Sequence, residues 1–200
     1  MRKLLLTTAA VAAAIGLAVA GEPSFGTFTD TRDGQTYKTV KVGKQTWMAQ
    51  NLNYQTDSSW CYENSAENCN KYGRLYTWNA AETACFPEWH LPSRQEWRDL
   101  VAAVGGGRTA GKRLKARSGW EKKGNGNDDF GFSALPGGYR NYYDGRFDNA
   151  DYRGRWWTAI EDRSDNNYAY YRYMNHRAYV REHLNNKNLG YSVRCVADSP

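Results

Sequence analysis

Residues 85–107, CFPEWHLPSRQEWRDLVAAVGGG, contain the clearest local structural signal in the chain. Ser93 stands three residues before Glu96, the spacing of a capping box, in which the serine oxygen accepts from a helix amide and the glutamate reaches back to the serine amide. An apolar face follows at helical spacing, made of Trp97, Leu100, Val101 and Val104. Three consecutive glycines then end the pattern. The stretch therefore predicts a capped amphipathic helix, with Glu96 as a capping residue rather than a catalytic acid.

Strand patterns lie on both sides of this helix. Upstream, GQTYKTVKVGKQTWMAQNL (34–52) alternates over short runs around a Gly43-Lys44 turn, which predicts a hairpin. Downstream, four runs are predicted as short strands, with a turn at 175–177 between the middle two: RWWTAI (155–160), NYAYYRYM (167–174), AYVRE (178–182) and GYSVRCV (190–196). A second, short helix is predicted at 73–85. The polar segments 55–72 and 108–155 are predicted as loops, and loops as long as the second are usually functional.

The N-terminus predicts export. Arg2 and Lys3 precede an apolar run that is too short to span a bilayer, and Ala18-Val19-Ala20 has the small residues of a cleavage site. We therefore predict a signal peptide at 1–20, a loose lead at 21–30 and one domain at 31–198, located in the periplasm, on the cell surface or in the medium. No further apolar stretch is long enough for a membrane span.

The charge of the exported part is modest. Two of the 27 basic residues and no acidic residue lie in the signal peptide, which leaves 25 basic against 21 acidic residues and a net charge of +4. Both signs are interspersed, without a basic block. This pattern is typical of a soluble protein with a weak attraction to acidic surfaces. Together with export, it argues against a nucleic-acid partner.

Four cysteines occur in the chain, at positions 61, 69, 85 and 195. An even number in an exported chain favours disulfides, and four cysteines allow three pairings. We favour Cys61 with Cys69, which closes a short loop, and Cys85 with Cys195, which ties the middle of the chain to its last strand. Zinc binding is less favoured because no C-x-x-C spacing occurs.

Five ordered motifs resemble a known family. They are TVKVGKQTWMAQNLNY (39–54), YGRLYTWNAA (72–81), ACFPEWHLPSRQEW (84–97), FGFSALPGGYR (130–140) and GYSVRCV (190–196). In this order they resemble the Fibrobacter succinogenes major paralogous domain. More distantly, WHLPSRQEW and the closing GYSVRCV are similar to a helix and the final strand of the formylglycine-generating, sulfatase-modifying enzymes.

This resemblance implies an α+β fold of the C-type-lectin-like kind, with two helices packed on a small, twisted, mostly antiparallel sheet and with long loops. It would also place Cys85 opposite Cys195. The formylglycine-generating oxidases depend on a reactive, copper-binding cysteine pair. In this chain every cysteine has a plausible disulfide partner, so the resemblance does not carry a catalytic residue over. An enzyme of that kind is kept as an alternative function.

Other catalytic and metal signals are sparse. The chain contains no G-x-S-x-G or H-E-x-x-H motif, and His90 lies beside the capping box, where a structural role is expected. No cofactor is predicted, with calcium as the one ion to consider. The calcium candidates are Asn127, Asp128 and Asp129, because oxygen ligands crowded in a loop suit this ion. Turn formation explains the same residues and is preferred.

The aromatic residues are the strongest functional signal. Eight Trp and 15 Tyr are present, and many of them crowd the second half of the chain. Tyr and Trp offer flat apolar area with a polar tip, which suits recognition, although packing in the core is the alternative for each residue. The ligand-binding candidates are Arg140, Tyr142, Tyr143, Arg146, Tyr152, Trp156, Tyr171 and Arg172. We therefore predict a non-catalytic module that binds glycan or an extracellular protein, with a structural envelope protein as a further alternative.

Overall fold

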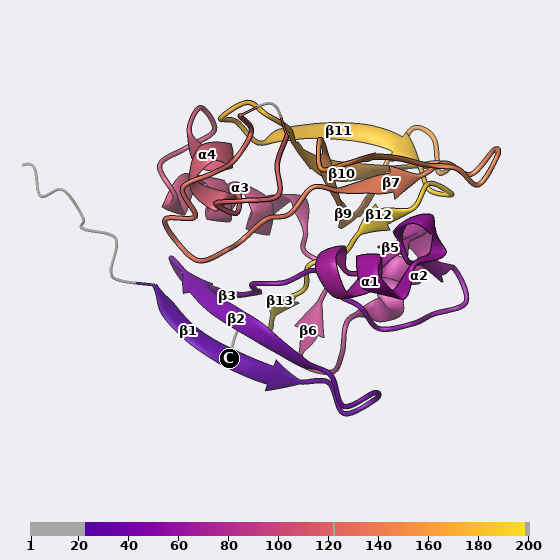
Figure 1. Ribbon diagram of the computed structural model, residues 1–200, viewed down its shortest axis with the longest axis horizontal. Helices are drawn as coiled ribbons and strands as arrows, with labels where there is room; N and C mark the ends of the chain where they lie inside the picture. Colours follow the sequence, from indigo (N-terminus) through magenta and orange to yellow (C-terminus); the bar gives the residue numbers. More distant parts are fainter. Residues whose placement is uncertain (1–22, 122, 199–200) are drawn as a thin grey trace, which may run out of the picture.

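A computed structural model describes residues 23–121 and 123–198 (Figure 1). The predicted signal peptide at 1–20 lies outside the described residues. The helices of the described part are α1 (Ala66–Tyr72), α2 (Trp78–Ala84), α3 (Arg94–Ala103) and α4 (Ala110–Leu114), with a short 3-10 helix η1 (Tyr62–Asn64) before α1. None of these helices has the length and apolar character that crossing a bilayer requires. Helices and strands are mixed along the chain, which confirms the α+β class.

The strands form two main sheets and one small ribbon. The first sheet has the order β1-β2-β3-β13-β6, from β1 (Ser24–Thr29), β2 (Thr36–Val42), β3 (Gln45–Met48), β13 (Val196–Ala197) and β6 (Trp89–His90). The second has the order β11-β10-β9-β12-β5-β4, from β11 (Arg181–Asn186), β10 (Tyr168–Met174), β9 (Gly154–Glu161), β12 (Tyr191–Ser192), β5 (Leu75–Tyr76) and β4 (Ser59–Trp60). The ribbon pairs β7 (Gly137–Arg140) with β8 (Phe147–Ala150). Pairing is antiparallel except between β12 and β9. In Figure 1 the β1–β2 hairpin and the β10–β11 hairpin lie on opposite sides of the molecule.

Strand β9 connects two hydrophobic clusters. Because successive side chains of a strand point to opposite faces, Trp156 and Trp157 enter different clusters. Trp156 packs with Trp97 of α3, at 6.2 Å between ring centroids, and Trp157 packs with Tyr191 at 4.4 Å. Both tryptophans are fully buried, and burial of a large apolar side chain stabilises a fold by about 1.5–3 kcal/mol.

The predicted capping box is present at the start of α3. Ser93 Oγ accepts from the Glu96 amide at 3.2 Å, and Glu96 Oε2 accepts from the Ser93 amide at 2.7 Å. The other carboxylate oxygen of Glu96 lies 2.7 Å from His90 Nε2, and His90 Nδ1 contacts Asp198. His90 therefore joins the end of the chain to α3, which confirms its structural role.

Both predicted disulfides are formed. Cys61 is bonded to Cys69, with 4.8 Å between the Cα atoms, and Cys85 to Cys195, with 6.0 Å. The second bond closes a loop of 110 residues. By restricting the unfolded chain, a disulfide across such a loop raises the free energy of unfolding by about 5 kcal/mol in the chain-entropy model. Disulfides are compatible with an exported protein, because oxidising compartments preserve them.

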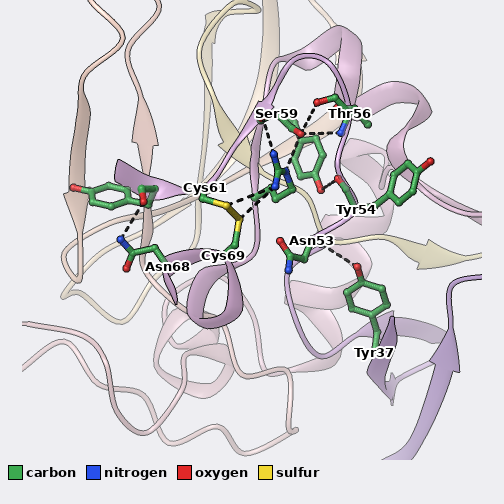
Figure 2. The surroundings of a disulfide bond; sticks show 11 residues. Tyr37, Asn53, Tyr54, Thr56, Ser59, Cys61, Asn68 and Cys69 are labelled. Atoms are coloured by element: carbon green, nitrogen blue, oxygen red, sulfur yellow. Dashed lines mark hydrogen bonds between the residues drawn. A yellow bond between two sulfur atoms is a disulfide. The ribbon is translucent and has the colours of Figure 1, made fainter. Parts of the chain in front are cut away.

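The first disulfide lies in a fixed polar surrounding (Figure 2). Ser59 Oγ donates to the Thr56 carbonyl at 2.8 Å and accepts from Arg74 Nε at 2.9 Å. Arg74 Nη1 also lies 3.6 Å from the sulfur of Cys61 and 3.7 Å from that of Cys69. The guanidinium thus fastens the disulfide to the loop beside it, and this part of the chain belongs to the frame of the domain.

Several elements differ from the prediction. The lead at 21–30 is not loose in its described part, because β1 pairs with β2 over six residues. The predicted loop at 55–72 contains β4, η1 and α1, and the predicted helix at 73–85 is divided into β5 and α2. The predicted strand at 178–182 begins at residue 181, and the predicted strand at 190–196 is divided between β12 and β13, in different sheets. These elements are short and depend on partners far away in sequence, so local patterns do not define them.

Candidate functional site

A groove of about 300 Å³ lies between the β7–β8 ribbon and the strands β10 and β11. We name it the tyrosine groove and define it by its lining residues: Tyr139, Asn141, Tyr142, Tyr143, Arg155, Tyr168, Asn185, Asn186, Leu189 and Tyr191. These residues come from the β7–β8 hairpin, from β9, β10 and β11, and from the segment that leads into β12. The sheet order β11-β10-β9-β12 brings these distant segments together.

Tyrosine rings form the walls of the groove. Tyr143 is 82% exposed, and its ring centroid lies 3.9 Å from that of Tyr142, with 33° between the two planes. Tyr168 is 38% exposed. Tyr139 is half-buried and meets the buried Tyr191 edge to face, at 6.4 Å. Exposed rings of this kind give a ligand flat apolar faces with hydroxyl groups at their rims.

Asparagine side chains surround the rings. Asn185 Nδ2 donates to the Tyr191 hydroxyl at 2.9 Å. Asn141 Oδ1 accepts from the Tyr143 amide at 3.0 Å, and Asn186 Oδ1 accepts from the Asn188 amide at 3.0 Å. These bonds use the side-chain oxygens of Asn141 and Asn186, so the amide nitrogens remain as donors for a ligand.

Arg155 lies at the floor of the groove. Alternation along β9 puts its side chain on the face of Trp157, and it is only 8% exposed. The guanidinium carbon lies 4.1 Å from the ring centroid of Tyr139 and 5.5 Å from that of Tyr191. Nε and Nη1 are buried without a hydrogen-bond partner in the described part of the chain. Arg155 is the one charged residue in the lining.

Two of the predicted ligand-binding residues, Tyr142 and Tyr143, line the groove. Arg140 lies beside the groove, where its guanidinium stacks over Trp60 at 4.1 Å. Arg146 lies near the tip of the β7–β8 hairpin with its side chain 80% exposed, and its Nε is 2.6 Å from Asp144 Oδ2. Neither arginine lines the groove.

Three other predicted residues are packed into the frame and do not line the groove, so a ligand-binding role for them is not supported. Trp156 is fully buried because α3 covers its face of β9. Tyr171 is 8% exposed and packs against Trp157 and Tyr191 in the core. Arg172 is buried in an ion pair with Glu182, at 2.6 Å, and its burial lowers the pKa of Arg172 to about 10.

Tyr152 lies apart from the groove. Its ring stacks on His176, with 5.9 Å between centroids and 17° between the planes. It is not a lining residue. The grouping of Tyr152 with the ligand-binding residues is therefore not supported by its position.

Sequence reasoning did not select Tyr139, Arg155, Asn185, Asn186 or Tyr191. The one available signal was Arg155 itself, a cation at the start of the otherwise apolar run RWWTAI. A charged residue in a strand that is buried on both faces requires a partner or a function. The others became groove residues only through the pairing of the strands.

The calcium candidates have partners within the protein. The Asp128 carboxylate accepts from the amide of Ser133 at 2.7 Å and from its hydroxyl at 2.6 Å. Asp129 Oδ2 accepts from Arg113 Nε at 2.9 Å, and the Asn127 carbonyl accepts from Arg117 Nε at 2.8 Å. Within residues 23–121 and 123–198 no group of three or more His, Cys, Asp or Glu side chains is arranged to hold a metal ion. These contacts explain the three residues as loop-forming residues.

A larger hollow of about 720 Å³ lies near the same loop, between it and β1. Phe25, which is 66% exposed, lines it together with Asp128 and Asp129. Both carboxylates are already engaged, as described above. The lining also contains the exposed cations Lys38 and Arg117, but Phe25 is its one aromatic side chain. The tyrosine groove combines several aromatic rings with amide groups, and we therefore take it as the candidate site.

Comparison with known proteins gives one match. The family model described as the Fibrobacter succinogenes major domain matches residues 40–197. No curated protein and no solved structure matches the chain. The match covers the buried frame and the tyrosine groove together. The chain therefore belongs to the Fibrobacter succinogenes major domain family.

Proposed function

We propose that the protein is an exported, non-catalytic binding module that recognises a saccharide in the tyrosine groove. One observation carries this proposal: exposed tyrosine rings and asparagine amides converge in a single groove. The C–H faces of a sugar ring stack on aromatic rings, and its hydroxyl groups accept from amide donors. A site that combines apolar walls with a few placed polar groups is the usual form of a small-ligand site.

The arrangement of elements supports this proposal. A hairpin comes first along the chain, α2 and α3 follow, and long segments and paired strands come last. This order suits the C-type-lectin-like fold, which we propose for the domain. In this arrangement the long segment between α4 and β9 carries the β7–β8 hairpin with its exposed tyrosines. A variable loop surface on a rigid frame is a common basis for recognition.

The cysteines favour binding over oxidase chemistry. All four are in disulfides, and Cys195 is fully buried, so the pair of reactive thiols that a formylglycine-generating oxidase needs is not free. The groove lining contains no carboxylate, histidine, serine or cysteine side chain. Those side chains are the usual general acids, bases and nucleophiles, and the tyrosine hydroxyls are the remaining groups in the lining that could take such a role.

The test is a glycan array with the chain from residue 21 onward, followed by affinity electrophoresis on the polysaccharides that bind. We expect Tyr143→Ala and Tyr168→Ala each to weaken binding about tenfold, because each removes a stacking face. Phe25→Ala is the matched control, since it removes an exposed aromatic ring outside the groove. Retention of full binding by both tyrosine variants would refute the groove as the site. Absence of binding to any saccharide would favour a structural role in the cell envelope.

A further inference from the structure

Arg155 differs from the other buried cations in its hydrogen-bond partners. In the described residues, four Lys and Arg residues are buried. Lys115 donates to two backbone carbonyls, at 2.6 and 3.0 Å. Arg172 pairs with Glu182, and Arg194 donates to side-chain and backbone oxygens. Arg155 has aromatic rings as its neighbours and no oxygen acceptor in the described part of the chain.

This arrangement is costly for the fold. A buried polar group without a partner destabilises the folded state, and more so when it is charged. Stacking over Tyr139 and Tyr191 offsets only a part of that cost. The remainder is unexplained by contacts within the protein. Residues that break local rules without compensation occur mainly at functional sites.

The position of Arg155 indicates what would compensate its charge. The residue lines the tyrosine groove, and Nη2 is the one guanidinium nitrogen that is not buried without a partner, so a bound ligand meets the guanidinium at Nη2. The lining contributes no negative charge that would oppose an anion. A guanidinium N–H donates to the oxygens of carboxylates and sulfate esters, and hydrogen bonds between such charged groups are about twice as strong as neutral ones.

We propose that the tyrosine groove takes an acidic saccharide, whose anionic substituent pairs with Arg155. This inference rests on the proposed saccharide function and adds the class of ligand. The exposed rings of Tyr143 and Tyr168 stack on the sugar, and the amides of Asn141 and Asn186 bind its hydroxyl groups. Arg155 favours saccharides that carry a negative charge over neutral ones. The shared chemistry is an anionic group on a sugar ring, as in a uronic acid or a sulfated sugar.

The experiment compares charged and neutral forms of the same polymer. Binding of the chain from residue 21 onward is measured on polygalacturonate against its methyl ester, and on dextran sulfate against dextran. We expect at least one charged polymer to bind about 10–100-fold more tightly than its neutral form, from one charge-assisted contact. The first pair reports a carboxylate and the second pair reports a sulfate ester.

Three variants assign that preference to one residue. Arg155→Met is expected to abolish the preference for the charged polymer while the neutral form still binds, and Arg155→Lys to keep a part of it. Arg146→Met is the matched control, because it removes an exposed arginine of the neighbouring hairpin and should leave the preference intact. Arg155→Met should fold, with a melting temperature unchanged or higher by about 2–6 °C, because it removes an unpartnered buried charge.

The outcomes separate this inference from the proposed function. Equal binding of charged and neutral polymers would overturn the acidic ligand and leave saccharide binding standing. An undiminished preference in Arg155→Met, or an equal loss in Arg146→Met, would overturn the role of Arg155. Failure of every polymer and of the glycan array to bind would overturn both proposals together.

Discussion

Arg194 and Arg155 are both buried arginines, yet they lie in two different kinds of surroundings. Arg194 is 1% exposed, and its Nε and Nη2 donate to Asn51 Oδ1 at 3.2 and 2.9 Å. Its Nη1 donates to the Phe132 carbonyl. Arg155 is 8% exposed and has no such acceptor in the described residues. The first charge is satisfied by the frame, whereas we propose that the second pairs with a ligand.

Asn51 shows how the frame is built. Besides Arg194, its Oδ1 accepts from Trp156 Nε1 at 2.9 Å, and its Nδ2 donates to the Tyr72 carbonyl at 2.8 Å. These partners belong to segments that are far apart in sequence. Most of them lie in the motifs by which the chain resembles its family, such as MAQNL, YGRLY and GYSVRCV. The motifs therefore specify the buried network and, of the groove lining, only Tyr139 and Tyr191.

Loss of the Cys85–Cys195 disulfide should have the largest effect on the frame. The double variant Cys85→Ala/Cys195→Ala is expected to lower the free energy of unfolding by about 5 kcal/mol, because the closed loop spans 110 residues. Urea unfolding measures this change. The matched control is Cys61→Ala/Cys69→Ala, which opens a loop of eight residues and should cost about 2–3 kcal/mol. Equal losses in the two variants would contradict the account.

Replacement of Arg194 should have the second-largest effect on the stability of the frame. Arg194→Met is expected to lower the free energy of unfolding by about 3 kcal/mol, since it leaves the buried carbonyl of Phe132 and the part-buried carbonyl of Ser133 without their donor. Arg146→Met, at an exposed position, should change it by less than about 0.5 kcal/mol. A neutral result for Arg194→Met would show that the network is not part of the frame.

Two histidines, His90 and His183, should have smaller effects on stability, and these effects should change with pH in opposite directions. Burial acts to lower the pKa of His90, but hydrogen bonds to Asp198 and Glu96 outweigh it and raise that pKa above 6.5. Its contribution to stability is therefore complete below about pH 6.5 and is lost as pH rises through the folded-state pKa. Because His90 is partly exposed, we expect this contribution to the free energy of unfolding to be about 0.5 kcal/mol. It is measured by comparing wild type with His90→Gln at pH 5.5 and again at pH 8.5.

His183 serves as the control for this measurement. Burial, followed by the charges of Arg181 and Arg155, lowers its pKa below 6.5. The unfolded chain therefore binds the proton more tightly, and the contribution of His183 to stability rises with pH. If the stability contributions of the two histidines changed with pH in the same direction, the environments described for them would be wrong. In Arg155→Met the pKa of His183, measured by NMR titration, should rise.

Local patterns predicted the local part of the fold. The capping box of α3, the turn at Gly43 and the β9 and β10 strands depend on neighbouring residues, and they are present as expected. Strand β1 was missed because most of its side chains are exposed on both faces and show no alternation. Helix α1 has seven residues and a disulfide, so its formation depends on tertiary contacts more than on propensity.

The site was predictable only in part for the same reason. Composition pointed to Tyr142 and Tyr143 of the β7–β8 hairpin, of which Tyr143 is exposed and Tyr142 is half-buried. Trp156 was misplaced because alternation separates the two faces of a strand without telling which face a helix covers. The meeting of Arg155 with Tyr168 and Asn185 depends on the sheet order, which no single segment of the sequence contains.

The most direct test of the difference between frame and groove is the free energy of unfolding of Arg155→Met, measured by urea titration beside Arg194→Met. If Arg155 is kept for a ligand, the Met variant should be as stable as the wild type or more stable by about 1–2 kcal/mol. A loss of about 3 kcal/mol, equal to that of Arg194→Met, would show that Arg155 belongs to the frame and would contradict the account.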